Sequence, residues 1–190
     1  MRSGTSTRPQ VKTRVRGRIA RVALVFLAAA GLTVGTAIPA NATYFASGFG
    51  AGFFYVNDYS YNTTYQPAMD QAIVNWNNAA APVDIQKIAG GNTVTAASYA
   101  ETWYGYYTRQ TTSFTIQLNS RVISSSCTNV SNCITSVFVH ELGHALYLDD
   151  NPPVASSIML SSRNRNVMTT PSAYDESEAT QYNTPGRRER

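Results

Sequence analysis

Alternation of apolar and polar residues predicts β-strands in the first half of the chain. Residues 114–119 alternate cleanly, as a strand with one buried face does. Residues 83–88 alternate in the same way. Three shorter segments are further strand candidates: residues 53–56, 93–97 and 103–108. A glycine interrupts residues 103–108, which suits a loop or an edge strand.

Apolar residues at helical spacing predict three helices. The first would begin near Pro67, which suits a first helical turn, and would bury residues that recur at helical spacing: Met69, Ala72, Ile73 and Trp76. The second would be capped by Ser131 or Asn132 and run through Leu146, before the two prolines at 152 and 153. The third covers residues 175–182. This order of elements predicts the α+β class, with the strands gathered in the first half.

Residues 1–42 are expected to form a secretory signal peptide. Basic residues crowd its start, an uncharged stretch begins at Val22, and Ala40-Asn41-Ala42 has the small residues of a cleavage site. The alternative is an uncleaved membrane anchor, but two glycines and a proline make this stretch a poor spanning helix. We therefore expect a secreted, extracellular protein without a stable membrane anchor, whose single folded domain is residues 43–190.

The signal peptide also changes how the charge is interpreted. The whole chain carries a net charge of +4. Seven of its 15 cations and none of its 11 acids precede residue 43, so the remaining 148 residues carry a net charge of −3. The basic character belongs to the signal peptide, and the folded domain is not expected to bind nucleic acid.

The two cysteines lie close together in the folded domain. Cys127 and Cys133 have five residues between them. In an exported protein this spacing favours a disulfide that closes a short loop. Metal binding by the two cysteines is less favoured, because a second cysteine pair is absent.

The strongest chemical motif is Val139-His140-Glu141-Leu142-Gly143-His144. Histidines four residues apart lie on one face of a helix, one turn apart, and can share a tetrahedral Zn²⁺ ion. Glu141 is placed to take a proton from a zinc-activated water and to serve as general base. The two histidines of the motif are the only ones in the chain, which argues against a chance match.

A catalytic zinc ion needs a third protein ligand, and no histidine remains to supply it. Asp149 and Asp150 follow the helix closely, and a carboxylate is an accepted ligand in this role. Two acids at a helix C-terminus interact unfavourably with the helix dipole. A purely structural role would therefore not explain why both aspartates lie there.

These residues resemble those of the metzincin zinc peptidases. Asp150 lies six residues beyond His144, and an aspartate in that slot is similar to the snapalysin-like small secreted proteases; matrixins are also similar. Ser157-Ile158-Met159 resembles the Met-turn of that clan, which places a methionine beneath the metal. The resemblance spans about residues 53–182, and only the zinc motif and the Met-turn are specific.

The resemblance implies a small twisted mixed sheet packed on two main helices, with a short C-terminal helix. It implies a zinc metalloendopeptidase that acts on protein or peptide substrates, with His140, His144 and Asp150 as ligands and Met159 as structural support. It also implies that an edge strand, here residues 114–119, lines the cleft and holds the substrate as an added strand.

One residue departs from the family pattern. Tyr147 stands where glycine is usual, three residues beyond His144, and a bulky residue with positive φ is strained by about 1–2 kcal/mol. Asp149 therefore stays an alternative third ligand. A catalytically weak or inactive secreted zinc-binding module is the alternative function, and a secreted structural domain without zinc is a third.

One catalytic Zn²⁺ ion is the expected cofactor. Asp58, Asp70 and Asp84 could bind Ca²⁺, but they lack a recognised loop spacing, so calcium is unsupported. We expect the domain to be a monomer.

Overall fold

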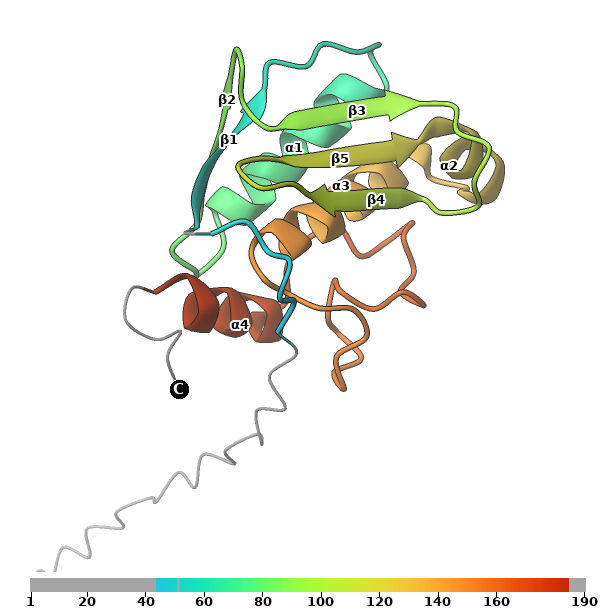
Figure 1. Ribbon diagram of the computed structural model, residues 1–190. Helices are drawn as coiled ribbons and strands as arrows, with labels where there is room; N and C mark the ends of the chain where they lie inside the picture. Colours follow the sequence, from blue (N-terminus) through green and yellow to red (C-terminus); the bar gives the residue numbers. More distant parts are fainter. Residues whose placement is uncertain (1–43, 51, 185–190) are drawn as a thin grey trace, which may run out of the picture. The chain divides into compact units, whose positions relative to one another are not determined.

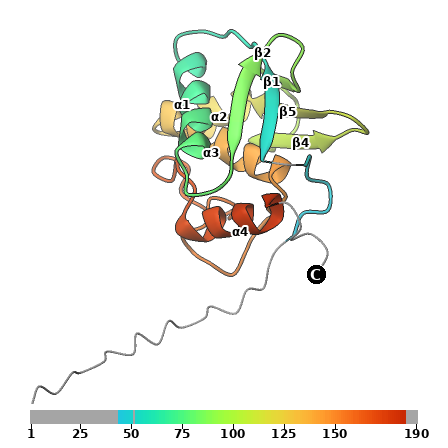
Figure 2. The same ribbon diagram turned by 90° about the vertical axis from the view of Figure 1, so that its left-hand side faces the viewer.

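Two small sheets and two central helices form the body of the protein. The computed structural model describes residues 44–50 and 52–184, all within the unit Pro39–Arg190. The expected signal peptide, residues 1–42, lies outside the described residues. Figures 1 and 2 show α1 (Tyr65–Asn77) and α3 (Val130–Ala145) side by side against the strands. The α+β class predicted from the sequence is confirmed.

The strands form one parallel pair and one mixed sheet. In the first sheet β1 (Phe53–Asn57) pairs in parallel with β2 (Asp84–Ile88). In the second, β5 (Phe114–Asn119) lies between a parallel β3 (Thr93–Ala97) and an antiparallel β4 (Gly105–Arg109). The expectation that residues 114–119 form an edge strand was therefore wrong. Both sides of β5 are paired, and β3 and β4 are the edge strands of this sheet.

Two asparagines connect the two sheets. The backbone N–H of Asn57 donates to the carbonyl of Asn92 at 2.7 Å, and the N–H of Asn92 donates to the carbonyl of Tyr55 at 2.9 Å. The Asn57 side chain accepts from the N–H of Val94 at 2.6 Å, and the Asn92 side chain accepts from the N–H of Phe114 at 2.9 Å. These bonds hold β1 beside β3 at one point, although the strands do not form a continuous ladder.

The start of one predicted helix differs from the expected one. The α3 helix is capped by Asn129, whose side chain accepts from the N–H of Asn132 at 3.1 Å, so neither Ser131 nor Asn132 is the cap. The α1 helix begins at Tyr65, so Pro67 lies in its first turn, as expected. A short helix, α2 (Ser120–Ser126), was not predicted, because its serine-rich sequence has no helical apolar pattern. The C-terminal helix α4 spans Ala173–Asn183.

The packing of α1 on α3 fixes the position of the motif helix. The indole Nε1 of Trp76, which is fully buried, donates to the carbonyl of Val139 at 2.8 Å. One turn earlier, the hydroxyl of Thr135 donates to the carbonyl of Ala68 at 2.9 Å. Among the described residues, none of the helices has the length and apolar character needed to cross a membrane.

The Trp76 contact can be tested by mutation. Trp76→Phe removes the indole N–H next to the first histidine and part of the buried ring volume, so we expect the free energy of unfolding to fall by about 1–3 kcal/mol. Val74→Ala, at a position 45% exposed on the same helix, should stay within about 0.5 kcal/mol of the native value. Urea unfolding measures both, and equal stabilities of the two variants would contradict this packing argument.

Candidate metal centre

The motif residues lie on a helix that is buried on all sides. Every residue from Cys133 to Ala145 is buried, because α3 is covered by the sheet and by α1. His140, Glu141 and His144 remain 8%, 5% and 7% exposed. Such low exposure of polar groups is costly unless they are paired or bind a ligand.

Both imidazole rings are oriented by backbone carbonyls. Nδ1 of His140 lies 3.0 Å from the carbonyl oxygen of Ile158, and Nδ1 of His144 lies 2.9 Å from that of Leu148. With the proton on Nδ1, each ring donates to its carbonyl and presents the lone pair of Nε2. Metal-binding histidines usually have such a hydrogen bond from the ring nitrogen that does not bind the metal.

The structure brings Asp150 to the two histidines. Its Oδ1 atom lies 3.2 Å from Nε2 of His140 and 3.9 Å from Nε2 of His144, and the three ligand atoms lie within 4.8 Å of one another. A tetrahedral Zn²⁺ ion with bonds of about 2.0–2.1 Å separates its ligand atoms by roughly 3.3 Å. The Asp150–His140 separation matches this value, and the three side chains form a group that could hold one such ion. Asp149 is not in this group, and its Oδ1 accepts from the N–H of Asp150 at 2.8 Å.

The chain turns back after α3 through two residues with positive φ. Tyr147 has a φ of 71° and Asn151 a φ of 55°. The strain expected from Tyr147 is thus present, at about 1–2 kcal/mol. Contacts from the N-terminal segment hold it, because the Tyr44 ring stacks on the Tyr147 ring at 5.3 Å and the N–H of Phe45 donates to the Tyr147 carbonyl at 2.8 Å.

The segment resembling a Met-turn lies beneath the motif helix. A methyl group at Gly143 would lie 2.5 Å from Sδ of Met159, so glycine is required between the two histidines for the methionine to approach. The buried Asp175 of α4 holds this turn, since its carboxylate accepts from the hydroxyl of Ser157 and from the N–H of Ile158 at 2.9 Å. The carbonyl that orients His140 is therefore itself fixed.

Glu141 lies against the start of β4. A methyl group at Gly105 would lie 2.4 Å from Oε1 of Glu141, so only a glycine lets the strand come this close. Burial raises the pKa of Glu141 to about 8, against the opposing effects of Arg163 and of a hydrogen bond from the Tyr107 backbone. A bound divalent cation would lower this pKa again by Coulomb attraction.

Burial also keeps the histidines neutral. Burial, followed by the positive charge of Arg163, lowers the pKa of His140 to about 4, and burial lowers the pKa of His144. Neutral imidazoles are the form that binds a metal, so both rings are competent ligands at neutral pH.

Arg163 is a site residue that sequence reasoning missed. Its buried guanidinium donates to the hydroxyl and carbonyl of Ser136 at 3.1 and 3.2 Å and to the carbonyl of Leu160 at 2.9 Å. Its Nη1 also lies 3.1 Å from Nδ1 of His140. It can donate to that nitrogen only if Nδ1 lacks the proton, and that tautomer would remove the Nε2 lone pair. The tautomer that donates to Ile158 is the one that binds a metal.

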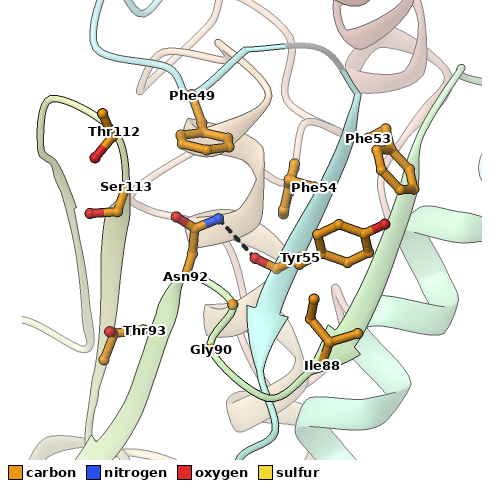
Figure 3. A pocket seen from close by; sticks show the side chains of 11 residues that line it. Phe49, Phe53, Phe54, Tyr55, Ile88, Gly90, Asn92, Thr93, Thr112 and Ser113 are labelled. Atoms are coloured by element: carbon orange, nitrogen blue, oxygen red, sulfur yellow. Dashed lines mark hydrogen bonds between the residues drawn. The ribbon is translucent and has the colours of Figure 1, made fainter.

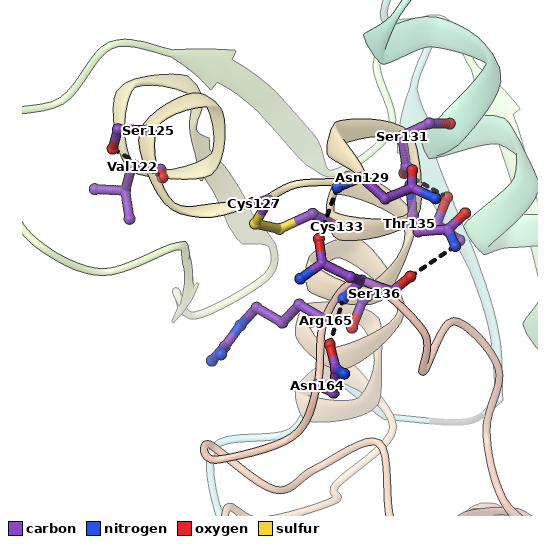
Figure 4. Close-up of a disulfide and its surroundings, with 12 residues drawn as sticks. Val122, Ser125, Cys127, Asn129, Ser131, Cys133, Thr135, Ser136, Asn164 and Arg165 are labelled. Atoms are coloured by element: carbon purple, nitrogen blue, oxygen red, sulfur yellow. Dashed lines mark hydrogen bonds between the residues drawn. A yellow bond between two sulfur atoms is a disulfide. The ribbon is translucent and has the colours of Figure 1, made fainter.

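The expected disulfide is present. Cys127 and Cys133 are joined by an S–S bond of 2.04 Å, which links the end of α2 to the first turns of α3 (Figure 4). The loop it closes is also bonded to the segment beyond the Met-turn-like residues. The Asn166 side chain accepts from the N–H of Asn129 at 2.8 Å, and the Asn132 side chain donates to the Asn166 carbonyl at 2.8 Å.

The acids considered for calcium do not gather. Asp70 forms an ion pair with Lys87 at 3.0 Å, and Asp84 accepts from Gln86. Within residues 44–50 and 52–184, the one group of three potential metal ligands is His140, His144 and Asp150.

A cavity of about 330 Å³ lies elsewhere, where β1 and β3 diverge (Figure 3). Its lining combines aromatic and apolar side chains with neutral polar ones, and it includes none of the residues of the metal centre: Phe49, Phe53, Phe54, Tyr55, Ile88, Gly90, Gly91, Asn92, Thr93, Thr112 and Ser113.

Comparison with known proteins gives a likeness in fold. No protein-family model matches the sequence, and no curated protein matches it either. Among solved structures, a chain of the GM1-bound form of the ECX AB5 holotoxin is similar, with a TM-score of 0.50 and 14% sequence identity. The match covers 68% of this chain and 78% of that one. At this identity the likeness concerns the fold alone.

The choice between the two aspartates can be tested directly. Asp150→Asn replaces the charged carboxylate ligand with a neutral amide, so the dissociation constant for Zn²⁺ should rise by at least about 100-fold. That is more than the loss of a residue that only hydrogen-bonds to a ligand causes. Asp149→Asn, one residue away, should change it by less than about tenfold. Competition titration with a chromogenic chelator measures both. A larger effect at Asp149 would overturn the assignment.

The contact between Gly143 and Met159 can be tested by a double-mutant cycle. Gly143→Ala should lower the free energy of unfolding by about 1–3 kcal/mol, because the added methyl group overlaps the methionine sulfur. In a Met159→Ala background the same change should cost less, giving a coupling of about 0.5–3 kcal/mol in urea unfolding. Strictly additive effects would show that the two residues do not meet.

Proposed function

We propose that residues 43–190 form a secreted zinc-dependent endopeptidase with a metzincin-like arrangement. The observation that carries this proposal is the convergence of His140, His144 and Asp150 within 4.8 Å, beside a buried carboxylate that is not a member of the group. Structural zinc sites use a closed set of four protein ligands, whereas three ligands leave a position for water or substrate.

The chemistry required is the addition of water across a peptide bond. Zn²⁺ bound by the three ligands would act as a Lewis acid toward the carbonyl and would lower the pKa of water. Glu141 would take a proton from the attacking water and later give it to the leaving amine, which yields a free carboxylate and a free amine. The carbonyls of Ile158 and Leu148 would keep the two imidazoles in the ligating tautomer.

The edge strand β4 offers a place for an extended substrate. It is bonded to β5 on one side, and its first residue, Gly105, leaves no room for a side chain beside Glu141. A peptide that pairs with this edge would pass the carboxylate, and main-chain hydrogen bonds of this kind bind substrate with little dependence on sequence. The role expected for residues 114–119 is thus proposed for β4.

Secretion is part of the proposal and rests on the sequence of residues 1–42. The Cys127–Cys133 disulfide supports it, because such bonds persist in oxidising compartments. The fold likeness to the holotoxin chain is compatible with the proposal and says nothing about activity.

Cleavage of an unfolded protein such as casein tests the function. The native protein should cleave it, a chelator should stop cleavage, and added Zn²⁺ should restore it. Glu141→Gln should retain zinc but lose about 10²–10⁴-fold in rate, because the general base is gone. Glu176→Gln, in the first turn of α4, is the matched control with the same chemical change.

The outcomes separate the alternatives. Cleavage that is unchanged in Glu141→Gln would rule out this mechanism. Stoichiometric zinc without any cleavage would favour the inactive zinc-binding module. A protein that binds no zinc would leave only a structural domain.

A further inference from the structure

Arg165 is a second arginine whose charge acts on Glu141, and one of its donors is unpaired within the described residues. Its Nη2 donates to the carbonyl of Ser161 at 2.8 Å. Its Nε is buried and has no hydrogen-bond partner in the described part of the chain. A guanidinium has five N–H donors, and leaving a buried one unpaired costs free energy. Arg163 differs, because its donors are used by Ser136 and Leu160.

The position of Arg165 relates it to the start of the edge strand. Its guanidinium lies over the ring of Tyr104, 4.1 Å from the centroid. Tyr104 directly precedes Gly105, where an added methyl group would lie 2.4 Å from Oε1 of Glu141. The charges of Arg165 and Glu141 also act on one another. Figure 4 shows the Arg165 side chain extending away from α3, near the Cys127–Cys133 disulfide.

Repulsion between two arginines favours an anionic partner beside Arg165. The charges of Arg163 and Arg165 act unfavourably on one another, while Glu141, Asp150 and Asp175 act favourably on Arg163. A carboxylate that comes to Arg165 would offset this repulsion, in the bidentate geometry that arginine favours.

We infer that Arg165 selects substrates that carry a carboxylate in the subsite at the Tyr104 end of β4. The inference rests on the proposed function and names the substrate class of the same site. The carboxylate can come from an aspartate or glutamate side chain or from the C-terminus of the peptide. In both cases the guanidinium of Arg165 binds the carboxylate while it packs over the Tyr104 ring.

The experiment uses matched peptides and the zinc-loaded protein. Fluorogenic, C-terminally amidated peptides carry Glu, Gln or Lys at each position around one scissile bond, and one further peptide has a free C-terminal carboxylate. At one position the native protein should cleave the Glu peptide with a kcat/KM about tenfold or more above that of the Gln peptide. Preference for the free C-terminus instead would identify that source of the carboxylate.

Substitution of the arginine should change the preference itself. In Arg165→Gln the Glu-to-Gln ratio should fall to near one, and in Arg165→Glu the Lys peptide should become the better substrate. A purely structural role of Arg165 would lower kcat/KM for all peptides alike and leave the ratio intact, which would overturn the inference. Arg121→Gln is the matched control, because the Arg121 guanidinium already donates to the carbonyls of Tyr99, Ala100 and Glu101 and its loss should not alter the ratio.

A binding measurement separates this inference from the proposed function. Glu141→Ala cannot cleave by the proposed mechanism, so its affinity for the uncleaved Glu and Gln peptides can be compared by calorimetry, with and without Arg165→Gln. A preference for the Glu peptide that depends on Arg165 supports the inference even if the native protein hydrolyses nothing. Equal affinities for both peptides in the presence of Arg165, together with cleavage by the native protein, would refute the inference and leave the peptidase proposal standing.

Discussion

The site depends on one constraint: two imidazoles on a buried helix must find hydrogen-bond acceptors for Nδ1 before they can offer Nε2 to a ligand. The interior carbonyls of the helix are used along its own axis, and only those of its last turn are free of intrahelical bonds. The chain that follows supplies both, from Leu148 and Ile158. The turn after α3 therefore orients the rings as well as delivering Asp150.

That turn is held from three directions. Asp175 of α4 binds the segment that carries the Ile158 carbonyl, and Met159 packs against Gly143 of the motif helix. The N-terminal residues Tyr44 and Phe45 hold the strained Tyr147. Asn183, near the end of α4, donates to the Leu146 carbonyl at 3.1 Å. Elements far apart in the sequence thus stabilise together the unfavourable backbone conformation of Tyr147, as a strained backbone requires.

The sequence predicted the features that have local causes. The strand over residues 114–119, the helix carrying the motif and the disulfide follow from alternation, helical spacing and cysteine separation. Spacing and the stop at Pro152 predicted that one of two aspartates would join His140 and His144, and the choice of Asp150 came from the resemblance to the metzincins.

The features that were missed depend on tertiary contacts. The central place of β5 is decided by β4, whose sequence did not distinguish a strand from a loop. No local pattern places Arg163 beside His140 or Arg165 over the Tyr104 ring, because both positions depend on the tertiary fold. The spacing of Ser172 and Asp175 is that of a capping box, so the role of Asp175 at the start of α4 follows from a local pattern. Its hydrogen bond to Ile158 does not follow from that spacing.

X-ray absorption at the zinc edge of the zinc-loaded protein tests the central claim most directly. The account predicts one ion with two imidazole nitrogens, and with oxygen from a carboxylate and from water, all at about 2.0–2.2 Å. A spectrum without imidazole scattering, or one dominated by sulfur at about 2.3 Å, would contradict it.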